Sequence, residues 1–194
     1  MLKQVLTVII FLAVMSLLVM QRFSLPPEVA VFDINSEQTY ERGELIKTTD
    51  NHLAIQIGEN IVYLGKNTVL ELDRIYTDEL TVTLTKGRLL VDATGNIPLV
   101  IETNHTDHLI HKGLASFINY DWLETIHVVP ISGSVQTTIR ETKEFLLTPR
   151  PLSIHETDPV SYEAIDVDLM VGPAADFYIW TGVTITKTED PELE

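Results

Sequence analysis

The feature that most constrains the fold is a series of short segments in residues 42–139 in which apolar and polar residues alternate. Leu80, Val82 and Leu84, for example, alternate with threonines, which is the pattern of a half-buried strand rich in β-branched residues. Such segments recur about every 8–12 residues, and no window keeps the 3.6-residue period of an amphipathic helix. The sequence therefore predicts an all-β domain. We expect a sandwich, roll or barrel, with a short solenoid-like coil as the alternative.

Turn residues separate these segments. Glycine favours turns because it adopts positive φ without steric cost. We expect the chain to turn or a strand to end at five triplets that contain glycine, which are Gly58-Glu59-Asn60, Gly65-Lys66-Asn67, Lys86-Gly87-Arg88, Thr94-Gly95-Asn96 and Ser132-Gly133-Ser134.

Length and charge limit the classes of function. The chain has 194 residues, of which 45% are hydrophobic, enough for one domain with a core. Lys and Arg number 13 against 28 Asp and Glu, a net charge of -15 that would repel a phosphate backbone, so we expect no nucleic-acid binding. The absence of cysteine excludes disulfides, thiol nucleophiles and cysteine zinc sites.

Residues 5–20 are uncharged and strongly apolar, and a helix of that length spans roughly 24 Å, at the short end for a membrane span. A cleaved signal peptide would need small residues directly after the run, which instead ends Val19-Met20-Gln21-Arg22-Phe23, with no pair of small residues. A buried core helix would need a polar side. An uncleaved single-pass membrane anchor is therefore the favoured interpretation, with a cleaved signal peptide and a core helix as alternatives.

Basic residues at the two ends of this run predict its orientation. The N-terminal amine and Lys3 lie before it and Arg22 after it, a small difference that favours an N-terminus inside and a β domain outside the cytoplasm. We expect an anchor at 1–23, a linker and first strand at 24–41, the β domain at 42–139, a C-terminal β extension at 140–186 and an acidic disordered tail at 187–194.

Seven short motifs in the middle of the chain resemble, in order, those of the FecR domain, the extracytoplasmic β domain of a family of bacterial membrane proteins. They are GELIKT at 43–48, LAIQIGENI at 53–61, TVLEL at 68–72, LTKGRLLV at 84–91, PLVIET at 98–103, GLASF at 113–117 and SGSV at 132–135. The stretch from residue 43 to residue 135 that contains them covers about half of the chain. The resemblance implies a membrane-tethered extracytoplasmic β domain.

The sequence departs from the family pattern in two turns and at its N-terminus. Gly58-Glu59-Asn60 occupies the usual Asp-Gly turn, and Gly113-Leu114 replaces the usual Gly-Thr. Well-known family members bind a sigma factor through a cytoplasmic helical segment, and only a few residues precede the apolar run here. We therefore carry over the β domain and not a sigma-factor-regulating activity.

The best metal candidate is His105, His108 and His111, with Asp107 between them. On a strand, this odd spacing puts His108 on the face opposite to its neighbours, so all three could not ligate one ion. The favoured interpretation is a polar loop and the start of a strand. Asn104-His105-Thr106 also fits a glycosylation acceptor, which would matter only in a eukaryotic secretory route.

Other chemical candidates have simpler interpretations. Ser132 and Ser134 flank a glycine in a predicted turn, with no nucleophile motif around them. Asp166 and Asp168 could form a carboxylate pair or bind calcium, but at this spacing we expect them on the wet face of a strand. We therefore predict no catalytic, cofactor-binding or metal-binding residues, and no enzymatic activity.

The C-terminal part is expected to add strands. Phe145–Leu147 and Leu152–Ile154 are short apolar segments, residues 161–171 favour a strand over a helix, and residues 177–185 form an aromatic, β-branched segment that we expect to be another strand. Its aromatic residues are expected in the core, with a partner-binding edge as the alternative.

The functional expectation is a membrane-tethered binding or structural module that contacts an envelope protein. One alternative is a signalling component that senses an envelope partner. The other is a protein that binds or cleaves surface polysaccharide, for which Trp122 and Trp180 could stack on sugar rings.

Overall fold

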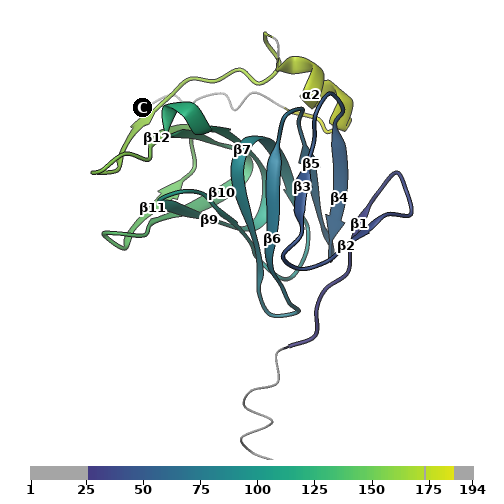
Figure 1. Cartoon of the computed structure of the whole chain (residues 1–194). Coiled ribbons are helices and arrows are strands. Elements are labelled where there is room, and N and C mark those ends of the chain that lie inside the picture. Colours follow the sequence, from purple (N-terminus) through teal and green to yellow (C-terminus); the bar gives the residue numbers. More distant parts are fainter. Residues whose placement is uncertain (1–25, 173, 186–194) are drawn as a thin grey trace, which may run out of the picture.

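The computed structural model describes residues 26–172 and 174–185, which form one large, mostly β structure (Figure 1). Its strands are β1 (Val31–Asp33), β2 (Thr39–Tyr40), β3 (Leu45–Lys47), β4 (Leu53–Ile57), β5 (Asn60–Leu64), β6 (Val69–Ile75), β7 (Leu80–Ala93), β8 (Leu99–Glu102), β9 (Thr106–Tyr120), β10 (Thr125–Ile139), β11 (Glu144–Thr148), β12 (Leu152–His155) and β13 (Ser161–Ala164). A 3-10 helix η1 (Asp121–Leu123) joins β9 to β10, and a helix α2 (Ala175–Thr181) follows the last strand.

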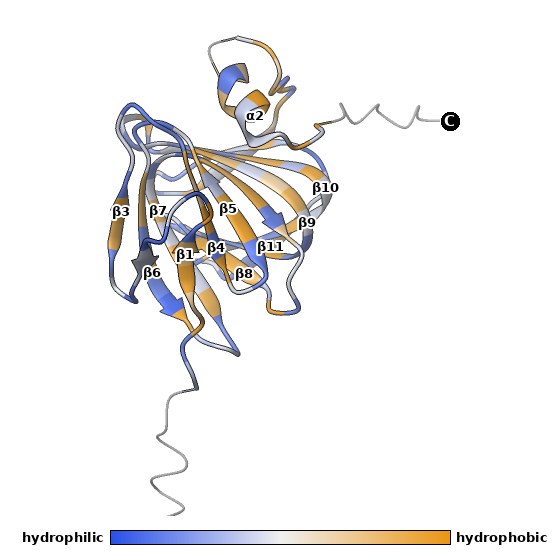
Figure 2. Ribbon diagram, turned by 90° about the vertical axis from the view of Figure 1, so that its right-hand side faces the viewer, coloured by the Kyte–Doolittle hydropathy of each residue, from blue (hydrophilic) through white to orange (hydrophobic). Residues whose placement is uncertain are grey.

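All of these strands belong to one mixed sheet. The order along its main path is β13-β12-β10-β9-β8-β7-β5-β4-β1-β2, while β11 pairs with β10 and β6 joins β3 to β7. Within the described residues, β7 and β8 form the only parallel pair. The sheet curls over itself so that its inner face encloses the apolar core (Figures 1 and 2). The prediction of a β domain is thus confirmed, and β11 to β13 extend the same sheet.

Three of the predicted turns lie where they were expected. Gly58 has a φ of 62° in the short turn between β4 and β5. The triplet at Gly65 follows the end of β5, and the triplet at Gly95 separates β7 from β8. Glycine at the end of a period-2 segment was therefore a reliable turn signal at these three places.

The predicted turn at Lys86-Gly87-Arg88 is wrong, because β7 runs through it as one strand of 14 residues. Before Gly87 the strand pairs with β6, and after it with β5 and with the second half of β9. Gly87 has a φ of 97°, and a Cβ there would lie 2.5 Å from the Cα of Thr68. Glycine is needed here for a bend and a close approach between two chain segments, and the chain does not reverse.

The predicted turn at Ser132-Gly133-Ser134 is wrong for a similar reason. It lies inside β10, where Gly133 faces Gly113 of β9 between two irregularities in the strand register. Both glycines have positive φ, 127° for Gly113 and 78° for Gly133. A Cβ on Gly113 would collide with the carbonyl oxygen of Ser132. The two long strands therefore bend together at a paired glycine position.

The apolar residues form two clusters on opposite faces of the long strands. In β7, Leu89 and Val91 belong to the main core, whereas Leu90 belongs to the second cluster. The second cluster consists of Leu90, Leu114, Ile118, Val129, Leu169, Phe177 and Tyr178. Strand alternation therefore sends neighbouring residues to different cores, and the C-terminal segment covers the outer face of the sheet.

The predicted strand at residues 177–185 is wrong, because residues 175–181 form α2. The helix ends at Gly182, which has a left-handed φ of 67° and donates its N–H to the carbonyl of Ile179, a common helix C-terminus. Phe177 and Tyr178 are buried against the sheet. Burial of two large aromatic side chains against the outer face outweighs the β-propensity of the segment.

The predicted strand at residues 161–171 is correct only for its first part, since β13 ends at Ala164. Beyond it, Ile165, Val167 and Leu169 are more buried than the residues between them, as the alternation indicated, but the backbone forms no ladder. No helix among residues 26–172 and 174–185 is long and apolar enough to cross a membrane. The proposed anchor at residues 5–20 and the acidic tail lie outside the described residues.

Candidate functional site

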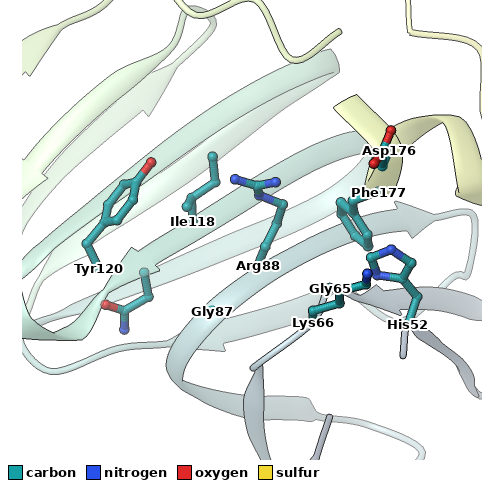
Figure 3. A pocket seen from close by; sticks show the side chains of 10 residues that line it. His52, Gly65, Lys66, Gly87, Arg88, Ile118, Tyr120, Asp176 and Phe177 are labelled. Atoms are coloured by element: carbon teal, nitrogen blue, oxygen red, sulfur yellow. The ribbon is translucent and has the colours of Figure 1, made fainter. Parts of the chain in front are cut away.

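A cleft of about 280 Å³ lies where α2 meets the sheet. It is formed by the segments flanking β4 and β5, by the bend of β7, by the end of β9 and by α2 (Figure 3). The residues that line it are His52, Gly65, Lys66, Gly87, Arg88, Ile118, Asn119, Tyr120, Asp176 and Phe177. We call this the Arg88 cleft, because Arg88 stands between Ile118 and Phe177 at its centre.

The bend at Gly87 fixes the position of Arg88. The carbonyl oxygen of Arg88 accepts a hydrogen bond from the backbone N–H of Gly65 at 2.8 Å. Its side chain then runs toward α2, where the guanidinium carbon lies 6.0 Å from the ring centre of Phe177 and 5.5 Å from that of Tyr178. Nη1 donates to the carbonyl of Ala174 over 3.4 Å. The helix and the β7 bend are thus joined through one arginine.

The guanidinium of Arg88 has unused hydrogen-bonding capacity. Its Nε is buried and has no hydrogen-bond partner. No carboxylate of the described residues forms an ion pair with Arg88, although Asp176 lines the same cleft. A buried donor without a partner costs about 1–3 kcal/mol. Such an arrangement is unusual for a purely structural arginine, which normally forms several bonds with acceptors.

His52 forms the other side of the cleft. Its ring lies 5.3 Å from Phe177 and 5.0 Å from Trp180, centre to centre, so the three rings form one aromatic wall. Burial, followed by the nearby charges of Lys66 and Arg88, lowers the pKa of His52, while Asp176 acts in the opposite direction. His52 is therefore neutral at neutral pH. Its Nδ1 is buried and also lacks a hydrogen-bond partner.

The cleft is a positively charged place on a strongly acidic protein. Lys66 is exposed, and with Arg88 it provides two cations against the single carboxylate of Asp176. Beside the cleft, α2 exposes apolar surface, with 40% of Trp180 and 62% of Ile179 accessible to solvent. A cation in an aromatic setting next to exposed apolar side chains is a composition typical of binding surfaces.

A second hollow of about 530 Å³ lies near Pro26, but its cations are already paired. Arg74 Nη1 lies 2.6 Å from Glu79 Oε1, and Arg42 Nε lies 2.9 Å from Glu28 Oε1. Burial and the neighbouring Asp107 raise the pKa of Glu102, another residue of this hollow. Because both of its cations are paired with carboxylates, this hollow offers less to an anionic ligand than the Arg88 cleft.

The histidine segment lies in and just before β9, and its side chains do not converge. His108 is fully buried, His105 is half-buried and His111 is exposed. The His108 ring lies between the hydroxyls of Thr106 and Thr137, each 3.0 Å away. Burial and the charge of Arg140 lower its pKa to about 3. His108 is thus a neutral member of an internal polar network.

Glu156 is the centre of that network. No pattern in the sequence around residue 156 indicated a buried carboxylate. Only 2% exposed, it accepts hydrogen bonds from the hydroxyls of Thr103 at 2.5 Å and Thr106 at 2.7 Å. The backbone N–H groups of Asn104 and His105 also donate to its carboxylate, at 3.3 and 3.0 Å. The carboxylate therefore anchors the start of β9 to the segment after β12.

The other predicted candidates are scattered. Ser132 is exposed, and its Oγ accepts a hydrogen bond from the N–H of Leu114 at 3.0 Å. Ser134, Asp166 and Asp168 are exposed too, and Asp168 accepts from the N–H of Met170. The two tryptophans lie on different elements, Trp122 in η1 and Trp180 on α2.

Sequence reasoning did not predict the Arg88 cleft. Arg88 was placed in a turn and residues 177–180 in a strand, so nothing brought them together. The bond between Arg88 and Ala174 joins positions 86 residues apart. The available signal was Arg88 beside Gly87, a cation next to a glycine in a chain with more than twice as many acidic as basic residues.

Two crystal structures resemble this chain in fold. Both are of a "putative anti-sigma factor" from Parabacteroides distasonis ATCC 8503, each with a TM-score of 0.53, 18% sequence identity and coverage of 63% of this chain. The match spans 60% of the length of each solved chain. No family model matches the sequence, and no curated protein matches it. The likeness concerns the fold and is consistent with the FecR-like β domain that the sequence resembles.

Proposed function

We propose that this protein is a membrane-tethered, extracytoplasmic binding module that acts through contacts with another protein of the cell envelope. The observation that carries the proposal is Arg88, a half-buried arginine in an aromatic cleft that no carboxylate of the described residues neutralises. A carboxylate of a partner protein would neutralise this charge. The exposed side chains of Trp180 and Ile179 beside the cleft would supply apolar contact area.

The tether is supported by sequence alone. Residues 5–20 are apolar and uncharged, and the distribution of Lys3 and Arg22 favours an N-terminus in the cytoplasm. The proposed location is therefore the cytoplasmic membrane, with a single span and the β domain outside. The likeness to the Parabacteroides structures supports the β-module part of the proposal.

A second candidate is a signalling role, in which the β domain senses an envelope partner and the state passes across the span. The observation that favours it is the fold likeness to the two Parabacteroides structures, which are described as a "putative anti-sigma factor". Their sequence identity of 18% and partial coverage bring the fold to this chain, so a regulatory activity remains the second proposal.

The proposal can be tested with two reporters and one cross-linker. Reporters active only in the cytoplasm or only after export are fused to the C-terminus of the full chain, and activity is measured in the membrane fraction. In the same chain, p-benzoylphenylalanine replaces Trp180, beside the cleft. The matched control carries it in place of Trp122, which is 80% exposed on η1.

We expect export-reporter activity in the membrane fraction and an envelope protein cross-linked at position 180 but not at position 122. Activity of the cytoplasmic reporter would overturn the location. Identical cross-linked products from both positions, or none from position 180, would overturn the assignment of the cleft as the contact site.

A further inference from the structure

We infer that the Arg88 cleft binds a carboxylate of an acidic segment of the partner protein, with an apolar neighbour of that carboxylate packed on Trp180. The inference rests on the proposed function and adds the chemistry of the partner. It follows from four features of the cleft: its charge, the geometry of Arg88, the aromatic wall and the exposed surface of α2.

Charge complementarity indicates an anion with one negative charge. Two cations, Lys66 and Arg88, face one carboxylate, Asp176, and His52 is neutral at neutral pH because burial and the two cations lower its pKa. The cleft therefore has an excess of one positive charge. A carboxylate would neutralise that excess, whereas a phosphate dianion would leave negative charge in a partly dehydrated place.

The geometry of Arg88 suits a planar carboxylate. A guanidinium carries five N–H donors in a rigid plane and binds carboxylates through two parallel hydrogen bonds. Arg88 uses Nη1 for one long bond of 3.4 Å to Ala174. The rings of Phe177 and Tyr178 beside it restrict its motion, so little conformational entropy would be lost on binding.

The surroundings of the cleft favour a peptide segment over a membrane surface. The aromatic wall of His52 and Phe177 continues to Trp180, whose ring lies 6.3 Å from that of Phe177 and is 40% exposed. An apolar side chain next to the carboxylate would cover this ring. The chain's net charge of -15 would repel an anionic bilayer as a whole, while a single acidic side chain could enter the local positive region.

The test uses the full chain in detergent and a blocked peptide, acetyl-Gly-Leu-Glu-Leu-Gly-amide. Binding is monitored by the NMR signals of the Arg88 Nε–H, the His52 ring and the Trp180 indole. The same peptide with Gln in place of Glu is the first control. The Gln peptide with a free C-terminus separates a chain-terminal carboxylate from a side-chain carboxylate. Inorganic phosphate and vesicles of anionic phospholipid are added separately.

Three variants localise the binding. Arg88→Gln removes the central charge, and Lys66→Glu reverses an exposed charge that contributes nothing to the core. Lys112→Gln removes an exposed lysine of β9 that does not line the cleft. We expect saturable shifts with the Glu peptide, at least about tenfold weaker binding for Arg88→Gln and Lys66→Glu, and unchanged binding for Lys112→Gln. Binding should raise the pKa of His52, because a carboxylate nearby favours the imidazolium.

Equal binding of the Glu and the blocked Gln peptides would overturn the inference. So would phosphate or vesicles that shift the Arg88 and His52 signals when the Glu peptide does not. If only the Gln peptide with a free C-terminus binds, the ligand is the carboxylate at a chain end, and the inference of an acidic side chain is overturned. If Lys66→Glu keeps the position-180 cross-link to its partner, the inference fails while the proposed function stands. If that cross-link does not form even without Lys66→Glu, the cleft is not the contact site, and the proposed contact through it fails.

Discussion

The hydroxyl of Thr68 bonds to both backbone groups of Arg88, accepting from its N–H at 3.0 Å and donating to its carbonyl oxygen at 3.2 Å. Thr68 is fully buried, and it lies beside Gly87, where β7 changes partners. A side chain thus takes the place of a neighbouring strand at the point where the ladder is interrupted. The same two bonds fix the backbone from which the Arg88 side chain enters the cleft.

Replacing Thr68 with Val should therefore destabilise the protein. Valine has nearly the same shape but leaves the N–H of Arg88 without its acceptor, at a cost of about 1–3 kcal/mol in the free energy of unfolding. Urea denaturation of the purified chain measures the change. Thr85→Val, at an exposed position of β7, is the matched control and should change stability by no more than about 0.5 kcal/mol. Equal effects of the two substitutions would contradict this role of Thr68.

Tyr178→Phe tests how α2 is held on the sheet. The Tyr178 hydroxyl lies 2.7 Å from the Oγ of Ser116, which also donates to the carbonyl of Leu89. Since Ser116 keeps that second bond, we expect the free energy of unfolding to fall by about 1 kcal/mol, as measured by urea denaturation. Tyr162→Phe removes a hydroxyl from an exposed residue of β13 and should have little effect. Unchanged stability of Tyr178→Phe would show that this hydroxyl does not help to hold the helix.

Glu156→Gln tests the buried network at the start of β9. The amide puts an NH₂ group where a carboxylate oxygen accepted hydrogen bonds, so a donor meets donors and about 1–3 kcal/mol should be lost. Thermal or urea unfolding gives the value, and Glu37→Gln at an exposed position is the control. A neutral effect of Glu156→Gln would mean that the network tolerates a neutral centre.

The lowered pKa of His108 should make the free energy of unfolding depend on pH. Its pKa is lowered to about 3 by burial and by the charge of Arg140, whereas the unfolded chain takes up the proton near the usual value of about 6.5. Between these values the unfolded state binds more protons, so stability falls as pH falls, by about 1.4 kcal/mol per pH unit. At pH 5 the loss relative to pH 7 is about 2 kcal/mol.

His108→Gln can keep hydrogen-bonding partners at this position but does not titrate. The pH dependence of its unfolding free energy between pH 7 and pH 5 should therefore be weaker than that of the original protein by about 2 kcal/mol. The same pH dependence in both proteins would contradict a neutral, buried His108. NMR titration of the imidazole offers a direct check.

The sequence predicted those parts of the fold that local periodicity determines. The β4–β5 hairpin follows from alternation on both sides of Gly58, and the first half of β7 from the alternating threonines. The bends at Gly87 and Gly133 were missed because a glycine inside a strand and a glycine in a turn look the same locally. Only the chain that passes close by, Thr68 in one case and Gly113 in the other, distinguishes them.

The Arg88 cleft could not be predicted from local periodicity, because it too depends on contacts between segments that are distant in sequence. Residues 177–180 have strand-like side chains, and their helix depends on a sheet face made by residues such as Leu90 and Ile118, far away in sequence. Strand geometry predicted that His108 and His111 lie on opposite faces, and β9 places His108 inside and His111 outside. Local periodicity could address that question, whereas the cleft needed tertiary contacts.

The facing pair Gly113 and Gly133 makes two distant stretches of sequence depend on each other. A side chain introduced at Gly113 would collide with the backbone at Ser132, whatever residue occupied the surrounding positions. Evolution could straighten these strands only by altering both sites and the register irregularities beside them at once. Relatives with the same bent strands should thus have glycine at both positions, and relatives that lose one of the two glycines should lose the other as well.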